Sequence, residues 1–180
     1  MKLLDELLPG CWLITPKLFE DARGRFVKTV QETFLNAHGL PFKMREEFYS
    51  SSRVGVLRGM HFQRPPHDHI KLVSCLVGEV LDVLVDLRTG PGYGRSASVR
   101  LSAENAHSIY IPSGIAHGFL AVSDGSLMVY KTSAEHVLSH DDGVRWDSFG
   151  FDWGIADPIV SDRDQSQPAF SVIQTPFAVS

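Results

Sequence analysis

The sequence predicts an all-β sandwich or barrel with short peripheral helices. Ten short runs of strand-forming residues are separated by Gly, Pro, Asp and Ser, a spacing typical of such folds. Long helical periodicity is missing, and one short helix is expected over residues 32–38. The length of 180 residues fits a single domain spanning 1–180. The expected strands are residues 10–15, 26–29, 44–50, 54–63, 71–77, 79–88, 96–101, 108–111, 118–122 and 126–132.

The clearest strand is the run Val80-Leu-Asp-Val-Leu-Val-Asp-Leu87. Alternation gives it one wholly apolar face, while Asp82 and Asp86 fall on the other. Because an unpaired buried carboxylate is costly, that second face needs water or partners. A barrel with a polar, ligand-holding interior satisfies this need, and so does a strand with one face in solvent.

Composition excludes several classes of function. The net charge of −4 gives no basic field, so nucleic acid is not an expected partner. Two cysteines, Cys11 and Cys75, form no disulfide framework and indicate a reducing compartment. Acids at positions 5 and 6 interrupt any signal-peptide core, and no apolar run approaches the roughly 20 residues of a membrane span. A cytoplasmic protein without membrane contact is expected.

Residues 55–63, Gly-Val-Leu-Arg-Gly-Met-His-Phe-Gln, place Arg58 and His61 on either side of Gly59. Residues three apart on a regular strand face opposite ways. A bulge at Gly59 would return both side chains to one face, because glycine tolerates the dihedral angles that bulges need. A cation beside a base that titrates near neutrality suits an anionic substrate that loses a proton.

Two further histidine motifs point to a ligand-holding barrel. Residues 112–117, Pro-Ser-Gly-Ile-Ala-His, resemble the second motif of the cupin jelly roll, a turn whose His117 projects into the barrel. His67 and His69 have the spacing of a metal-binding pair. The glutamate that follows such a pair in metal-dependent cupins is replaced by Val73 and Ser74. We therefore expect no metal.

Taken together, these segments make the chain similar to the nucleotide-sugar 3,5-epimerases, the dTDP-4-dehydrorhamnose 3,5-epimerase family. The resemblance implies a cupin-type jelly roll, no cofactor, and removal of a proton from C3 or C5 of a 4-keto sugar, followed by reprotonation on the opposite face. It implies a homodimer as well, with Arg23 crossing to the partner. The matching segments are residues 21–26, 55–63, 71–73, 78–88, 101–105, 111–119, 130–131, 143–146 and 159–164.

The resemblance also assigns roles to residues. His61 matches the base, and Asp164 matches the acid that is hydrogen-bonded to it, with Asp162 as the competing choice. Lys71 matches the cation that holds the enolate oxygen, and Tyr130 matches the acid on the far face. The expected substrate-binding residues, of which Arg23 and Arg58 contact the diphosphate, are Arg23, Phe26, Glu46, Phe48, Arg58, Asp82, His117 and His136.

The chain departs from the family pattern on ligand-contacting segments. Glu46-Glu-Phe-Tyr49 stands where the family has Gln, Asp, Asn and His, and Glu135-His136 stands where paired tyrosines are common. Losing an amide donor and gaining negative charge alters nucleotide recognition. These changes leave two alternatives to a dTDP-sugar epimerase. One is an epimerase for a CDP- or GDP-linked 4-keto sugar, and the other is a jelly roll that binds a sugar nucleotide without turnover.

Overall fold

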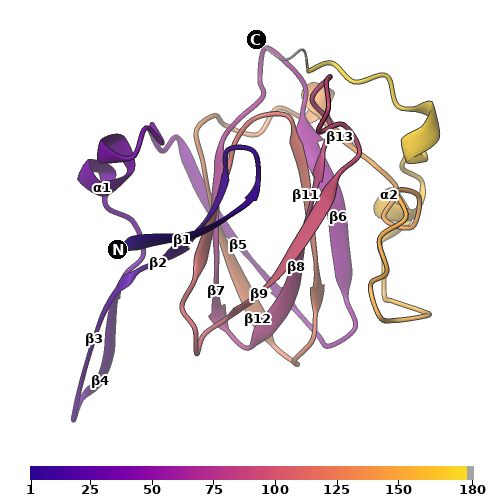
Figure 1. The fold of residues 1–180 in the computed structure, drawn as a ribbon. Helices are drawn as coiled ribbons and strands as arrows, with labels where there is room; N and C mark the ends of the chain where they lie inside the picture. Colours follow the sequence, from indigo (N-terminus) through magenta and orange to yellow (C-terminus); the bar gives the residue numbers. More distant parts are fainter. Residues whose placement is uncertain (178–180) are drawn as a thin grey trace.

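Two antiparallel sheets face each other in a computed structural model that describes residues 1–177 (Figure 1). The larger sheet has the strand order β1-β2-β10-β7-β12-β5, and the smaller has the order β13-β6-β11-β8-β9. The prediction of an all-β fold is confirmed. The bounds are β1 Lys2–Leu8, β2 Cys11–Thr15, β5 Glu46–Ser52, β6 Leu57–Gln63, β7 Lys71–Val77, β8 Glu79–Asp86, β9 Ser96–Ser102, β10 Ser108–Ile111, β11 Ile115–Ala121, β12 Ser126–Thr132 and β13 Asp141–Gly143.

Short elements surround this sandwich. Strands β3 (Lys17–Asp21) and β4 (Gly24–Lys28) form a separate hairpin that projects away from the larger sheet, at the lower left of Figure 1. The helices are α1 (Glu32–Ala37) and α2 (Asp162–Gln165), with 3₁₀ turns at Leu138–His140 and Phe170–Val172. No helix within residues 1–177 is both long and apolar enough to span a bilayer.

Three clusters of buried apolar side chains hold these layers together. The first lies between the sheets and contains Val80, Leu84 and Phe119. A second, with Val83 and Val85, packs under the segment that follows β13, which covers the smaller sheet on the right of Figure 1. The third lies beneath α1 on the outer face of the larger sheet. Strand β8 is therefore buried on both faces, and its polar face points into the sandwich, as the first of the two sequence interpretations predicted.

The predicted bulge is present in β6. In the pairing of β11 with β6, His117 lies opposite His61 and Phe119 lies opposite Arg58, so Gly118 alone faces two residues. Gly59 has a φ of 133°, a value that residues with a side chain rarely adopt. The bulge is tight, since a Cβ built on Gly59 would come within 2.5 Å of the Gly118 Cα. This close approach explains why two glycines meet here.

Each of the ten predicted runs overlaps a strand, and the predicted helix matches α1. One boundary was wrong in a way that concerns the site. Strand β11 begins at Ile115, so His117 lies within a strand and not in a turn. Its direction is set by the alternation of β11 and by its position opposite His61. Strands β1, β3 and β13 and helix α2 were not predicted.

Candidate active site

A cavity of about 270 Å³ opens between the two sheets. The larger sheet contributes β5, β7 and β12 to its walls, and the smaller sheet contributes β6, β11 and β13. Most of the predicted site residues lie on this one surface. Its lining comprises Glu46, Phe48, Ser50, Arg58, His61, Phe62, Gln63, His69, Lys71, His117, Gly118, Phe119, Tyr130, Thr132, Ala134, His136, Asp141 and Arg163.

A histidine–carboxylate pair lies on the smaller-sheet side of the cavity. His61 Nε2 donates a hydrogen bond of 2.7 Å to Asp164 Oδ1, and the Gly59 amide donates to Asp164 Oδ2 at 3.1 Å. Asp164 sits in α2, where Ser161 caps the helix by accepting from the Asp164 amide. Of the two acids considered from the sequence, Asp164 is therefore the one in contact with His61.

Asp164 remains a carboxylate in this setting. Burial raises its pKa, but the hydrogen bond and charge of His61 and the Gly59 amide outweigh burial and bring the pKa below its usual value. With Nε2 donating to this carboxylate, the lone pair of the neutral imidazole lies on Nδ1. Within residues 1–177 that nitrogen accepts no hydrogen bond, and it is available to take a proton.

A second pair, His117 and Asp82, lies deeper. His117 Nε2 donates to Asp82 Oδ2 at 2.8 Å, and both side chains are buried. Burial raises the pKa of Asp82, against the opposing effects of His117 and Lys71. Asp82 was expected to bind substrate, but it lies outside the cavity lining and contacts His117 instead. Its place in the structure is that of a group that orients the His117 ring.

Lys71 and Tyr130 reach the cavity from the larger sheet. Lys71 Nζ donates to the His61 carbonyl at 3.1 Å, and burial lowers the pKa of the ammonium group to about 8. The Tyr130 ring stacks on Phe48, with centroids 4.8 Å apart, and its hydroxyl lies 3.4 Å from Ser50 Oγ. Burial raises the pKa of Tyr130, so the phenol stays protonated and can act as a donor.

Charged groups surround the remaining part of the cavity. Asp141 Oδ2 accepts from His136 Nε2 at 2.9 Å and from Arg163 Nη2 at 2.7 Å. Glu46 Oε2 accepts from the His136 amide. Arg58 donates to Ser52 Oγ and to the Ser51 carbonyl, and no acid among the described residues forms a salt bridge with it.

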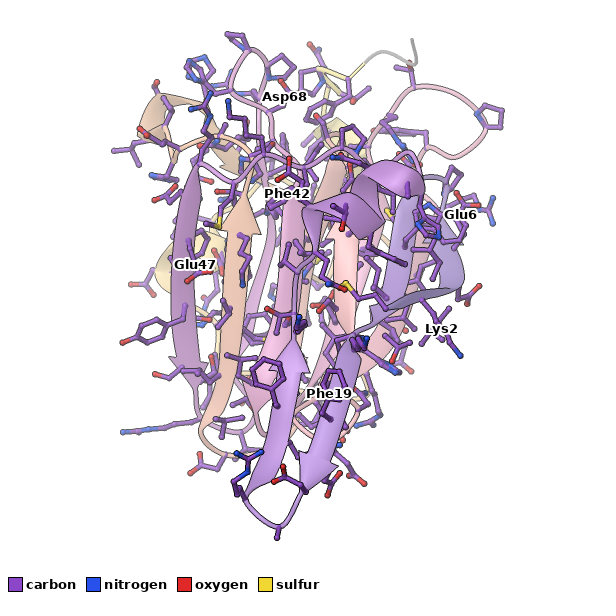
Figure 2. The ribbon with its side chains drawn as sticks, turned by 90° about the vertical axis from the view of Figure 1, so that its left-hand side faces the viewer. Lys2, Glu6, Phe19, Phe42, Glu47 and Asp68 are labelled. Carbon is purple, nitrogen blue, oxygen red and sulfur yellow. The ribbon has the colours of Figure 1, made fainter. Side chains whose placement is uncertain are left out.

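Two predicted binding residues are not brought to this cavity. Arg23 and Phe26 lie on the projecting hairpin, where the Arg23 side chain is 90% exposed and pairs with Asp21 at 2.6 Å. Phe26 is 60% exposed and packs against Phe19. Figure 2 shows Phe19 on this hairpin, in front of the larger sheet, and Figure 1 shows the hairpin projecting away from the sandwich.

His67 and His69, which have the spacing of a metal-binding pair, lie in different surroundings. The His67 ring packs on His140, with centroids 4.4 Å apart, while His69 lines the cavity. Nowhere in residues 1–177 do three or more His, Cys, Asp or Glu side chains gather in a metal-binding group. Other cavity residues were missed from the sequence, among them Gln63, Asp141 and Arg163. Gln63 and Arg163 fall inside matched segments and could have been found there, whereas Asp141 has no local signal.

This geometry is that of an acid–base enzyme whose site lies inside a β-sandwich. An imidazole lies on one wall of the site, and a phenol and an ammonium group lie on the other. A family profile described as dTDP-4-dehydrorhamnose 3,5-epimerase matches residues 5–171. The chain belongs to this family of isomerases.

Individual relatives support the same family. The dTDP-4-dehydrorhamnose 3,5-epimerase of Shigella flexneri is 39% identical over 91% of this chain and 93% of its own length. That of Methanothermobacter thermautotrophicus is 40% identical, with 92% of each chain covered. A Legionella pneumophila epimerase crystallised with dTDP-4-keto-L-rhamnose superposes with a TM-score of 0.93 at 29% identity, covering 99% of both chains. These matches confirm the family and the cupin-like fold predicted from the sequence.

Proposed function

We propose that this protein is a cofactor-independent epimerase of a dTDP-linked 4-keto-6-deoxyhexose, acting at C3, C5 or both. The observation that carries the proposal is the His61–Asp164 pair, which faces Tyr130 across one cavity. The two side chains belong to different sheets, so a sugar held between them presents its opposite faces to a base and to an acid.

The proton moves from carbon to His61 in the first step. The 4-keto group acidifies the neighbouring C–H bonds, and Nδ1 of His61 takes the proton while Asp164 stabilises the resulting imidazolium. Positioned proton transfer of this kind contributes about 10²–10⁴-fold. The electron pair of the C–H bond moves into an enolate, whose oxygen the Lys71 ammonium group holds. Tyr130 then donates its proton to the other face of the carbon, which inverts the centre.

The remaining residues bind the substrate. Arg58 has no acidic partner among the described residues, and a guanidinium group suits the diphosphate. The cavity wall around the sugar and the nucleobase includes His117, Phe48, Glu46 and His136. Arg23 and Phe26 could reach a substrate only from a second copy of the chain, so we also propose a homodimer. Two buried free thiols support a reducing cytoplasm as its location.

The comparisons favour thymidine over the alternative nucleotides. The relatives carry dTDP-sugar names, and the Legionella structure holds a dTDP-linked sugar. None of these comparisons supports a CDP- or GDP-linked substrate. Glu46 Oε2 accepts from the His136 amide, which fixes the orientation of this carboxylate on the cavity wall. A 3'-monoepimerase from Streptomyces bikiniensis is also similar, at 30% identity, so single and double epimerisation both occur among the relatives.

Proton NMR of a dTDP-4-keto-6-deoxyhexose in D₂O tests the proposal. We expect deuterium to enter at C3, C5 or both with wild-type protein, and the pattern identifies the carbons. His61→Ala should abolish exchange, and Tyr130→Phe should allow exchange while blocking inversion. The exposed His38, at the C-cap of α1 and outside the cavity, supplies the control His38→Ala, which should behave as wild type. Tight binding of the sugar nucleotide without any exchange would instead select the non-catalytic binding protein.

A further inference from the structure

Gln63 ends β6 and lines the cavity, but it has no part in the mechanism above. Its side chain is buried, and it bonds to two segments next to strands of the larger sheet. Gln63 Oε1 accepts from the Val137 amide at 2.6 Å, and Gln63 Nε2 donates to the His67 carbonyl at 2.8 Å. Nε2 also donates to the Glu135 carbonyl at 3.3 Å and lies 2.8 Å from His69 Nδ1. One buried amide thus connects the smaller sheet to the chain before β7 and after β12.

The orientation of this amide follows from its backbone partners. A backbone N–H only donates, so the side-chain atom beside the Val137 nitrogen is the Gln63 oxygen. A backbone carbonyl only accepts, so the atom beside the carbonyls of His67 and Glu135 is the Gln63 nitrogen. These contacts therefore need a side chain that carries both a donor and an acceptor, and an apolar side chain of similar length loses all of them.

The segment after β12 that Gln63 holds carries His136 on the cavity wall. This segment forms no strand, so no ladder of backbone hydrogen bonds fixes it. The Glu135 carbonyl and the Val137 amide, on either side of His136, bond to the Gln63 side chain instead. The His136 amide itself donates to Glu46 Oε2 at 2.8 Å. Side chains thus supply the partners of these three backbone groups, and the position of His136 depends on them.

The backbone of Gln63 helps to fix the ring of His136 as well. Gln63 lies opposite Asp141 in the pairing of β13 with β6, and Asp141 Oδ2 accepts from His136 Nε2 at 2.9 Å. The His136 ring is half-exposed, whereas Lys71 and Tyr130 are buried in the same cavity. A substrate whose sugar meets those two buried groups therefore extends its nucleotide toward solvent, past His136.

We propose that Gln63 is a positioning residue, which holds His136 on the cavity wall for contact with the nucleotide of the substrate. This inference rests on the proposed function, since it assigns a further role in the same site. The role needs no contact between Gln63 and the substrate, because protein groups use its donor and its acceptor. A side chain that is already held binds a ligand more tightly than a mobile one, because less conformational freedom is lost on binding.

A double-mutant cycle tests whether Gln63 acts through His136. Gln63→Met keeps the length of the side chain but loses its donor and acceptor. We expect it to weaken dTDP binding, measured by titration calorimetry, about threefold to tenfold, the usual effect of one neutral hydrogen bond. In the His136→Ala background, Gln63→Met should cause no further loss, because the residue that it positions is absent. In the D₂O exchange assay, Gln63→Met should raise KM more than it lowers kcat. Gln31→Met, which lies before α1 and outside the cavity, should bind dTDP as wild type does.

Two results of the cycle would overturn the proposal: unchanged dTDP affinity in Gln63→Met, or an equal loss with and without His136. If Gln63→Met shows no cooperative melting transition, Gln63→Asn takes its place with the same expectations, since its amide is too short to reach Val137. Amide hydrogen exchange of the wild type needs no substitution. We expect the Val137 amide to be protected, and exchange at the rate of an open loop would also overturn the proposal. Absent deuterium entry into the sugar, with dTDP bound, would instead contradict the proposed function.

Discussion

Two histidine–aspartate pairs in the sandwich differ in the direction in which the pKa of the carboxyl group is shifted. Asp164 is 4% exposed, and its contacts with His61 and the Gly59 amide bring its pKa below the usual value. Asp82 is fully buried, and burial raises its pKa although His117 donates to it. The pKa shifts have opposite directions because Asp164 gains the Gly59 amide and the charge of Arg163 in addition to its histidine, whereas burial dominates at Asp82. A carboxylate that stays charged can stabilise an imidazolium, which suits the base His61.

Lys71 gives the site a pH dependence that can be measured. Burial lowers the pKa of Lys71 to about 8, so the free enzyme loses this cation above that pH. We predict an alkaline limb near pH 8 in kcat/KM, which reports groups of the free enzyme. The effect of Lys71 deprotonation on stability has the opposite sign to its effect on kcat/KM. Between about pH 8 and pH 10.5 the folded state has released a proton that the unfolded state still binds, so the contribution of Lys71 to stability rises with pH.

Two substitutions check the assignment of this limb. Lys71→Arg keeps a positive charge, so the limb near pH 8 should disappear whatever the remaining activity. Lys71→Met removes the charge and should lower kcat/KM by about 10²–10³-fold. Its melting temperature should not fall, because an apolar side chain carries no desolvation penalty in a buried site. A limb near pH 8 that persists in Lys71→Arg would show that another group is titrating.

At the scale of elements, the bulge in β6 decides where His61 points. A Cβ on Gly59 would meet the Gly118 Cα at 2.5 Å and the His117 carbonyl at 3.1 Å, and the Gly59 amide also holds Asp164. We predict that Gly59→Ala destabilises the fold by about 2–5 kcal/mol, from overpacking and backbone strain combined. It should also lower activity more than the stability loss explains, because the base and its acid shift together. Thermal unfolding and the exchange assay measure the two effects.

Gly125→Ala is the matched control for this prediction. Gly125 has a φ of 67°, and a Cβ there would meet no atom within 4 Å. It therefore reports backbone strain without a steric clash, about 1–2 kcal/mol, and it is not among the residues that line the cavity. If Gly59→Ala were no more destabilising than Gly125→Ala, the tight contact between β6 and β11 would not be what sets the bulge.

The elements also show how much of the fold could be predicted from the sequence. Strands with regular alternation, such as β8 and β12, were predicted, as was the bulge at Gly59. Strand β1 was missed because it is an edge strand whose pairing with β2 shifts register twice, which breaks the alternation. Strand β13 is Asp-Asp-Gly and has no apolar pattern; only its pairing with β6 makes it a strand. Asp141 enters the cavity through that pairing, so no local signal could reveal it.

At the scale of the whole molecule, the hairpin β3–β4 is unexplained by one copy of the chain. The hairpin leaves the sandwich (Figures 1 and 2), with Phe19 48% and Phe26 60% exposed. Within residues 1–177, the side chain of Arg23 forms its salt bridge with Asp21, on the same hairpin. Exposed strand edges and aromatic side chains of this kind favour pairing with a second copy. The proposed dimer would place Arg23 and Phe26 beside a cavity that belongs to the partner.

Mixing two inactive variants tests that arrangement. Arg23→Ala should bind the sugar nucleotide poorly, and His61→Ala should not exchange protons, so each homodimer has two defective sites. If Arg23 serves the partner's cavity, a heterodimer has one site with both defects and one site with neither. Equal mixing after denaturation and refolding should then restore about a quarter of wild-type sites, since half of the dimers are mixed. If Arg23 served its own chain, every site would keep a defect, and the mixture would stay as inactive as its components.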